Sequence, residues 1–198
     1  MKKILVLLPV TAEQKTVLAE SLRGGESAYE LVYTEGAAPT EADLRDAAVI
    51  VGAFDPALAR HAERAEWIQL SSAGADAFTA PGVLGQDVVL TCAVGAYGLT
   101  VSEHMLAQTF ALIRRFGQYG RNQARHEWRA MGRVSSVEGS VIAVLGLGDI
   151  GGSYARKVKA LGAYVIGLRK SSREKPDYVD EQYTIDELDA EFEDAEEL

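Results

Sequence analysis

A glycine-rich loop is the part of the sequence whose residue types and spacing best suit chemistry. It consists of Gly146, Leu147, Gly148, Asp149, Ile150 and Gly151. We expect an apolar strand before it at Val141–Leu145, a helix after it from about Ile150 to Leu161, and a second strand at Tyr164–Leu168. In such a setting the first glycine permits a tight turn, the second admits a pyrophosphate and the third lets the helix pack on the strand.

The helix that follows the loop would also direct its free N–H groups at the phosphates. The spacing therefore predicts a dinucleotide-binding loop, in which every residue except Leu147 is a candidate cofactor contact. The alternative is a tight turn with a purely structural role.

The residues that end the second of these strands bear on which dinucleotide binds. An acidic residue there would hydrogen-bond the ribose 2′-hydroxyl of NAD. The sequence has Arg169, Lys170 and Ser171 instead, and no acidic residue before Glu174. An arginine can bind a 2′-phosphate through two parallel hydrogen bonds, whereas a carboxylate would repel it. We therefore expect NADP, bound by these three residues, with NAD or a solvated basic turn as the alternatives.

Composition narrows the classes of protein to which the chain can belong. Its 198 residues carry a formal net charge of −9, which argues against a nucleic-acid surface. The single cysteine, Cys92, suits a reducing cytoplasm. Three scattered histidines and one cysteine do not build a metal site, and no apolar stretch reaches the length of a membrane span. We expect a cytoplasmic protein with no metal, nucleic-acid or membrane partner.

Short apolar strands alternate with helices over the first half of the chain. Strands are expected at Ile4–Leu8, Leu31–Thr34, Val49–Gly52, Trp67–Leu70 and Val88–Thr91. Helices are expected at Ala12–Leu22, from Thr40 with Asp43 as its capping-box partner, and at Pro56–Glu63. Because such alternation implies a parallel sheet covered by helices, residues 1–98 are predicted to form a flavodoxin-like α/β domain.

The second half begins with a long apolar helix. Thr100 and Glu103 have the capping-box spacing at its start. Apolar residues all around a helix are typical of one buried between domains or subunits. An irregular, partly basic arm follows over 117–137. With the glycine loop, residues 99–198 are predicted to be the first part of a Rossmann dinucleotide-binding domain.

Three segments of the sequence resemble the D-isomer-specific 2-hydroxyacid dehydrogenases. Segments 67–76, 88–104 and 142–151 are similar to this family's substrate loop, its crossover into the interdomain helix and its cofactor loop. The resemblance implies a two-domain NAD(P)-dependent oxidoreductase with its active site in the cleft. It would transfer a hydride between the nicotinamide and a 2-keto or 2-hydroxy acid, acting on the CH–OH group.

The resemblance also implies roles for particular residues. Main-chain N–H groups of Ser72, Ala73 and Gly74 would bind the substrate carboxylate. Thr100 and Val101 would lie near the nicotinamide. The long helix and the arm match regions that the family uses for dimerisation, so a homodimer is expected.

The sequence departs from the family pattern towards its end. Only two strands are expected after the start of the cofactor domain, then a capped helix from Thr184 with Glu187, whereas a Rossmann domain has about six strands. The family's catalytic arginine, acidic residue and histidine have no matching position, and neither does its final helix, which returns to cover the first domain. No catalytic residue is therefore assigned, and His104 is predicted to be structural.

We accordingly expect the chain alone to be inactive. It would be a fragment of a longer enzyme or a chain whose open sheet edge a partner covers. The alternative function is a catalytically incomplete nucleotide-binding or dimerisation module.

Overall fold

The chain folds into two compact units, Met1–Val94 and Gly95–Leu198, each of which is considered by itself. The computed structural model describes residues 1–23, 28–170 and 174–187. Ser171, one of the predicted cofactor contacts, lies outside these ranges. The assignment of the two units as substrate and cofactor domains stays a prediction.

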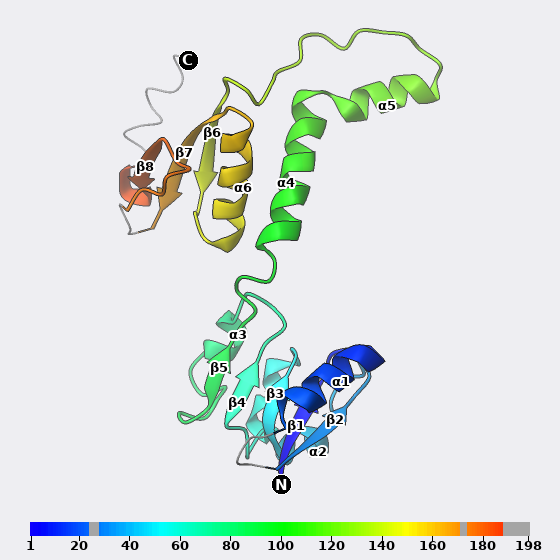
Figure 1. Ribbon diagram of the computed structural model, residues 1–198, viewed down its shortest axis with the longest axis vertical. Helices are drawn as coiled ribbons and strands as arrows, with labels where there is room; N and C mark the ends of the chain where they lie inside the picture. The colour runs from blue at the N-terminus through cyan, green and yellow to red at the C-terminus, as the bar shows by residue number, and fades with distance from the viewer. Residues whose placement is uncertain (24–27, 171–173, 188–198) are drawn as a thin grey trace. The chain divides into compact units, whose positions relative to one another are not determined.

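The first unit is built on a five-stranded parallel sheet (Figure 1). Its strands are β1 (Lys2–Val6), β2 (Tyr29–Tyr33), β3 (Ala47–Val51), β4 (Trp67–Gln69) and β5 (Val89–Thr91). They lie in the order β2-β1-β3-β4-β5, the flavodoxin-like arrangement. The predicted fold class is confirmed for this unit.

Four short helices connect these strands: α1 (Ala12–Ser21), α2 (Glu41–Arg45), the 3-10 helix η1 (Pro56–His61) and α3 (Asp76–Thr79). The predicted capping box of α2 is confirmed, since the Asp43 amide donates to Thr40 Oγ1 at 3.2 Å and Thr40 N donates to Asp43 Oδ2 at 2.8 Å. The predicted helix at Pro56–Glu63 is confirmed at its start, but it is a 3-10 helix and ends at His61. Asp55 Oδ1 accepts from the Ala57 amide at 2.9 Å, and the chain turns as a short 3-10 helix.

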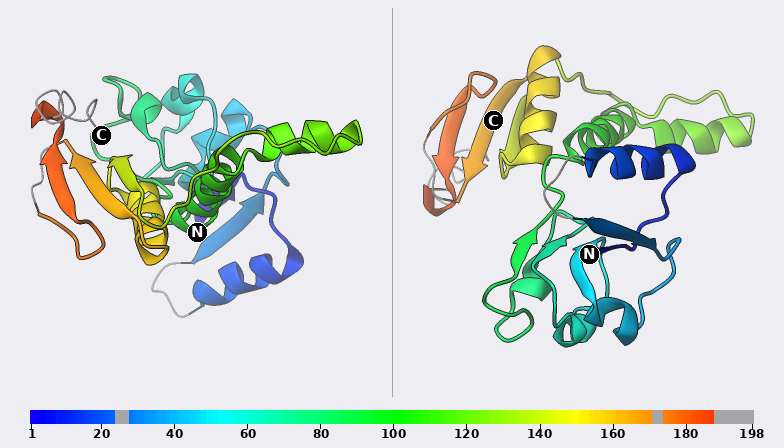
Figure 2. Two further views of the ribbon diagram at one scale, coloured as in Figure 1. Left: turned by 90° about the horizontal axis from the view of Figure 1, so that it is seen from above. Right: turned by 60° about the horizontal axis from the view of Figure 1, so that its bottom comes forward.

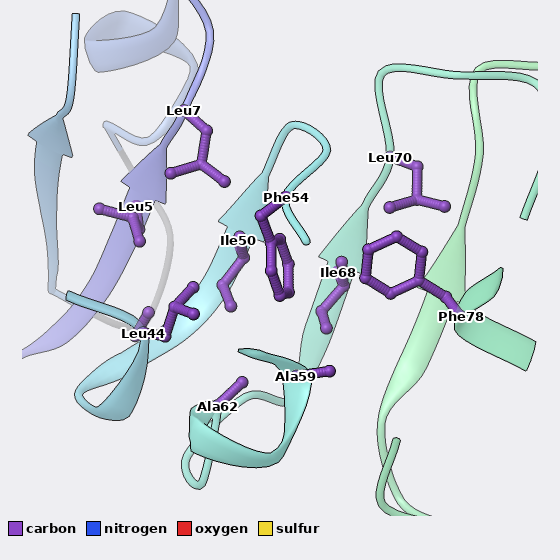
Figure 3. Packing of buried hydrophobic residues seen from close by; sticks show 11 residues of the cluster. Leu5, Leu7, Leu44, Ile50, Phe54, Ala59, Ala62, Ile68, Leu70 and Phe78 are labelled. Atoms are coloured by element: carbon purple, nitrogen blue, oxygen red, sulfur yellow. The ribbon is translucent and has the colours of Figure 1, made fainter. Parts of the chain in front are cut away.

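One face of this sheet carries the core of the unit (Figure 3). Leu5, Ile50 and Ile68 are paired in register across β1, β3 and β4, and none of them is exposed. Phe54 and Phe78 pack over them edge to face, with ring centroids 5.2 Å apart. Helices α2 and η1 close this side, opposite α1 (Figure 2, right).

The opposite face of the sheet becomes steadily more exposed from β1 towards β5. Ile4, Val49, Trp67 and Val89 form one row across the sheet. The exposed fraction rises along this row from 8% at Ile4 to 42% at Trp67 and 57% at Val89. Within the described residues, β4 and β5 are therefore covered on one face only.

The second unit contains a three-stranded parallel sheet in the order β6-β7-β8 (Figure 1). Its strands are β6 (Val141–Leu145), β7 (Tyr164–Arg169) and β8 (Glu181–Thr184). The helix α6 (Asp149–Ala160) connects β6 to β7 and packs on the sheet through Ala155 and Val158. This is the strand–loop–helix–strand unit that the sequence predicted.

Strand β8 was not predicted. It starts with Glu181 and Gln182, so it lacks the apolar run by which a buried strand is recognised. Its register against β7, Arg169 opposite Thr184, depends on long-range pairing. The predicted helix from Thr184 is, over the described residues, a 3-10 turn (Ile185–Glu187, η2), in which Glu187 accepts from Thr184 as its capping pattern requires.

Two further helices precede the sheet of this unit: α4 (Gly98–Ile113) and α5 (Phe116–Ala124). The predicted capping box at Thr100 is wrong, because α4 begins at Gly98 and Tyr97 caps it without a side-chain hydrogen bond. The arm predicted to be irregular contains α5. Arg115, in the left-handed conformation at φ 59°, separates α4 from α5.

None of the helices in the described ranges combines the length and apolarity that a membrane crossing requires. The same residues contain no cluster of three or more histidine, cysteine or acidic side chains suited to a metal ion.

Candidate cofactor and substrate sites

The glycine loop joins β6 to α6, and its glycines meet different constraints. Gly146 has φ 87°, in the left-handed region that side chains disfavour. A Cβ at Gly151 would lie 1.9 Å from the Gly146 carbonyl oxygen, so the helix can approach the strand only with glycine there. A Cβ at Gly148 would meet nothing within 4 Å, which leaves space beside this part of the backbone.

The first turn of α6 starts from this open space. Gly148 is its N-cap and offers no side-chain acceptor, so the N–H groups of the first turn stay free of a side-chain cap. Asp149 and Ile150 begin the helix. A helix N-terminus with free N–H groups carries a partial positive charge and suits an anion such as a pyrophosphate.

The Asp149 side chain itself faces the first turn of α4. A Cβ added to Gly98 would lie 2.3 Å from Asp149 Oδ1 and 2.8 Å from its Cγ. The carboxylate therefore lies directly on the Gly98 backbone and not over the open space at Gly148. The Asp149 side chain is thus engaged within the protein.

Arg169 ends β7 beside the same loop. Its Nη2 donates to the Leu147 carbonyl at 3.4 Å. Its Nε is buried and has no hydrogen-bond partner among the described residues. Lys170, which follows, is exposed. The guanidinium group is therefore held near the loop with donors to spare.

Leu147 is a residue of this site that sequence reasoning missed. Besides accepting from Arg169, it fills the space above Gly167, where a Cβ would come within 2.5 Å of Leu147 Cδ1. The only available signal was a glycine in the middle of an apolar strand, which often marks a close approach by a neighbour.

The first turn of α4 holds the other predicted cofactor contacts, Thr100 and Val101. Thr100 is exposed and Val101 is partly buried. Both belong to the turn that begins at Gly98, on which the Asp149 carboxylate lies. The structure thus brings these two residues and the glycine loop to neighbouring helix N-termini within one unit.

The predicted substrate loop lies in the first unit, where the chain leaves β4. The Ala93 amide donates to the Ser72 carbonyl at 2.8 Å, which places the loop at the carboxyl edge of the sheet next to β5. Ser72 Oγ donates to the Gly74 carbonyl at 2.8 Å and shapes the turn. The amides of Ala73 and Gly74 donate to no other described residue. Exposed backbone N–H groups of this kind can hold an anion.

The histidines that sequence analysis set aside have neighbours that fit structural roles. His104 Nε2 lies 3.4 Å from the amide of Gln108, one helical turn further along α4. His61 Nε2 on η1 lies 3.4 Å from Glu41 Oε1 on α2. The pair connects two surface helices and contacts neither candidate site.

Comparison with known proteins identifies the second unit. Residues 106–198 match the family model of the D-isomer specific 2-hydroxyacid dehydrogenase, NAD binding domain. The greater part of the second unit is therefore similar to the NAD-binding domain of the D-isomer specific 2-hydroxyacid dehydrogenases. The resemblance noted in the sequence is therefore confirmed, together with a nicotinamide dinucleotide as the type of cofactor that the family binds.

Solved dehydrogenase structures share the fold of nearly the whole chain. A family member from Aeromonas salmonicida matches 96% of the chain with a TM-score of 0.78 and 23% identity. An NADPH-dependent glyoxylate/hydroxypyruvate reductase from Sinorhizobium meliloti matches 96% with a TM-score of 0.72 and 28% identity. D-Lactate dehydrogenase from Aquifex aeolicus, solved with NAD, matches 91% with a TM-score of 0.68 and 19% identity.

The chain spans only part of each of these dehydrogenases: 60%, 58% and 55% of their lengths, respectively. Two of them were solved with different nicotinamide cofactors, NADP in the reductase and NAD in the lactate dehydrogenase. The cofactor preference of this chain must therefore come from its own residues.

Proposed function

We propose that the chain is the cofactor-binding and carboxylate-binding portion of an NADP-preferring oxidoreductase that interconverts a 2-keto and a 2-hydroxy acid. The observation that carries the NADP preference is the position of Arg169. Its guanidinium lies beside the glycine loop, and its buried Nε has no partner among the described residues. A buried donor without an acceptor is costly, and a phosphate oxygen would satisfy it.

The second unit has the features that a bound dinucleotide needs. Gly148 and the free N–H groups of α6 would take the pyrophosphate, and Arg169 with Lys170 would take the 2′-phosphate. Thr100 and Val101 would face the nicotinamide. When bound, the nicotinamide supplies the hydride transfer itself. The part of these residues is to hold and orient it.

The substrate carboxylate would bind to the loop of the first unit. The unpaired amides of Ala73 and Gly74 and the turn shaped by Ser72 offer donors to a carboxylate, and small side chains leave those donors accessible. These backbone donors would recognise the carboxylate and would not select the side chain of the substrate.

The exposed apolar residues of α4, α5 and the arm support a homodimer as the working assembly. Leu112, Phe116 and Trp128 are large apolar residues exposed in this region of the second unit. A large exposed apolar surface is typical of a protein–protein contact. We infer that a second copy of the chain covers it.

The NADP preference is tested by titrating the purified protein with NADPH and with NADH and following nucleotide fluorescence. NADPH should bind more tightly. Arg169→Ala should weaken NADPH binding about tenfold or more, the size expected for charge-assisted hydrogen bonds, and leave NADH binding nearly unchanged. Arg125→Ala, an exposed arginine at the end of α5, is the control and should change neither.

Tighter binding of NADH, or NADPH binding that does not change in Arg169→Ala, would refute the phosphate-binding role.

Addition of glyoxylate to the NADPH complex tests the expectation that these 198 residues bind without turnover, because no residue among them is assigned to proton transfer. Steady oxidation of NADPH would contradict that expectation.

A further inference from the structure

Ser102 forms a buried polar contact between α4 and α6, close to the proposed cofactor site. Its side chain has no solvent exposure. Its Oγ donates to the carbonyl oxygens of the first turn of α4, Gly98 O and Leu99 O, the latter at 3.0 Å. It accepts a hydrogen bond of 2.8 Å from Lys157 Nζ on α6. One hydroxyl thus connects two helices that lie side by side (Figure 1).

The lysine is engaged mainly with this hydroxyl. Lys157 is partly buried, and no carboxylate of the described residues lies within ion-pair distance of it. An ammonium group taken partly out of water needs hydrogen bonds in return. The bond to Ser102 supplies one of these hydrogen bonds.

The first turn of α4 is therefore connected to α6 at two points. The Asp149 carboxylate lies on the backbone of Gly98, and Lys157 reaches Ser102 one turn further along α4. Thr100 and Val101 lie between these two points in the sequence. Since Asp149 belongs to the glycine loop, the two contacts fix the position of this turn relative to the loop.

We propose that Ser102 and Lys157 are positioning residues for the nicotinamide half of the cofactor. By holding the first turn of α4 on α6, they set the distance between Thr100–Val101 and the pyrophosphate loop. The adenine half would depend on Arg169 and the glycine loop, and the contact between Ser102 and Lys157 involves neither of them. The inference rests on the proposed function, because it assumes that this turn faces the nicotinamide.

The two halves of the cofactor can be probed separately. NADPH tests the whole site, and adenosine 2′,5′-bisphosphate tests the adenine half alone. Ser102→Ala removes the hydroxyl and should weaken NADPH binding about 3- to 10-fold, the range for the net contribution of one typical intramolecular hydrogen bond. Binding of the bisphosphate should stay within about twofold of the parent protein. Lys157→Met should show the same pattern, so the test survives if one variant folds poorly.

Tyr154→Phe is the matched control. The Tyr154 hydroxyl lies 2.7 Å from Thr109 Oγ1, so it also joins α6 to α4, but far from the first turn of α4. Its loss weakens the contact between the helices without releasing that turn, and both ligands should bind it as they bind the parent.

Each outcome distinguishes the positioning role of Ser102 and Lys157 from the proposed binding of NADP. Equal weakening of both ligands by Ser102→Ala, or no weakening of either, would overturn the positioning role while leaving NADP binding in place. The same NADPH loss in Tyr154→Phe would show that the contact is only structural. A parent protein that binds neither ligand would overturn the proposed function and this inference together.

Discussion

Gly148 and Gly151 belong to one loop, yet an added methyl group would meet opposite surroundings at the two positions. At Gly151 it would collide with the Gly146 carbonyl, and at Gly148 it would project into open space. Gly151 is therefore needed for folding and Gly148, by our proposal, for ligand access. The two demands can be separated by experiment.

Gly151→Ala should lower the free energy of unfolding by about 1–3 kcal/mol, because backbone must move to admit the methyl group. Gly148→Ala should change it by about 0.5 kcal/mol or less, since its φ of −73° suits alanine. The alanine at 148 should nonetheless weaken NADPH binding by obstructing the pyrophosphate. Urea unfolding and nucleotide titration of both variants measure these effects. Equal stability losses in the two variants would contradict this assignment.

Residue-scale prediction from sequence worked where the requirement is local. The conformation of Gly146 and the close approach at Gly151 follow from the loop spacing alone. The contacts of Leu147 with Arg169 and of Lys157 with Ser102 were not foreseen, because each joins residues far apart in the chain. The ligand-binding roles of the predicted residues stay predictions.

At the scale of elements, an ion pair ties α6 to the strand that sequence analysis missed. Lys159 Nζ on α6 donates to Asp180 Oδ1 at 2.5 Å, and the Val165 amide of β7 donates to Asp180 Oδ2 at 2.7 Å. Asp180 directly precedes β8. These bonds, the one from Lys159 first, hold the pKa of the Asp180 carboxyl below its ordinary value.

A lowered pKa in the folded state gives a stabilisation that is present above the unfolded pKa of about 4 and is lost as pH falls through the folded value. Asp180→Asn should therefore lower the midpoint of urea unfolding at neutral pH. The difference from the parent should shrink as the pH falls below about 4 and the Asp180 carboxyl becomes protonated in the folded state too. Asp177→Asn, at an exposed neighbour, is the control and should change the midpoint little. A pH-independent difference would show that the carboxylate charge is not responsible.

Elements with an apolar run were predictable, and the capping-box pattern was right at Thr40 and wrong at Thr100. Elements defined by pairing or by glycine content were not predictable. The five strands of the first unit and α2 with Thr40 and Asp43 appeared as expected. Strand β8 escaped because its residues are polar and its register comes from β7. Helix α5 was not predicted because Gly117 and Gly120 interrupt the helical periodicity of its apolar residues.

At the scale of the whole molecule, each sheet has strands whose apolar residues are exposed on one face, within the described residues. In the second unit, Val141 and Leu145 of β6 are exposed, just as Trp67 and Val89 are in the first. Such surfaces favour association. Helix α5 adds Phe116 and the arm adds Trp128, and the proposed homodimer depends on both residues.

Phe116→Asp should convert a dimer into a monomer, because a charge buried in an apolar contact is costly. Light scattering coupled to size-exclusion chromatography measures the mass directly. Val17→Asp changes an equally exposed apolar residue of the first unit and should leave the mass unchanged. A parent protein that is monomeric at micromolar concentration would rule out the homodimer.

Because both tryptophans are exposed, their fluorescence reports whether a partner covers them. Trp128 is fully exposed and Trp67 is 42% exposed, and the sequence contains no other tryptophan. Ultraviolet emission of the folded monomer therefore comes in large part from the hydrated Trp128 indole at long wavelength, and unfolding of the monomer should shift it only slightly. A shift towards the blue would instead signal that something has covered one of these rings. Association with a partner thus becomes visible without an added dye, whereas loss of the fold must be followed by circular dichroism.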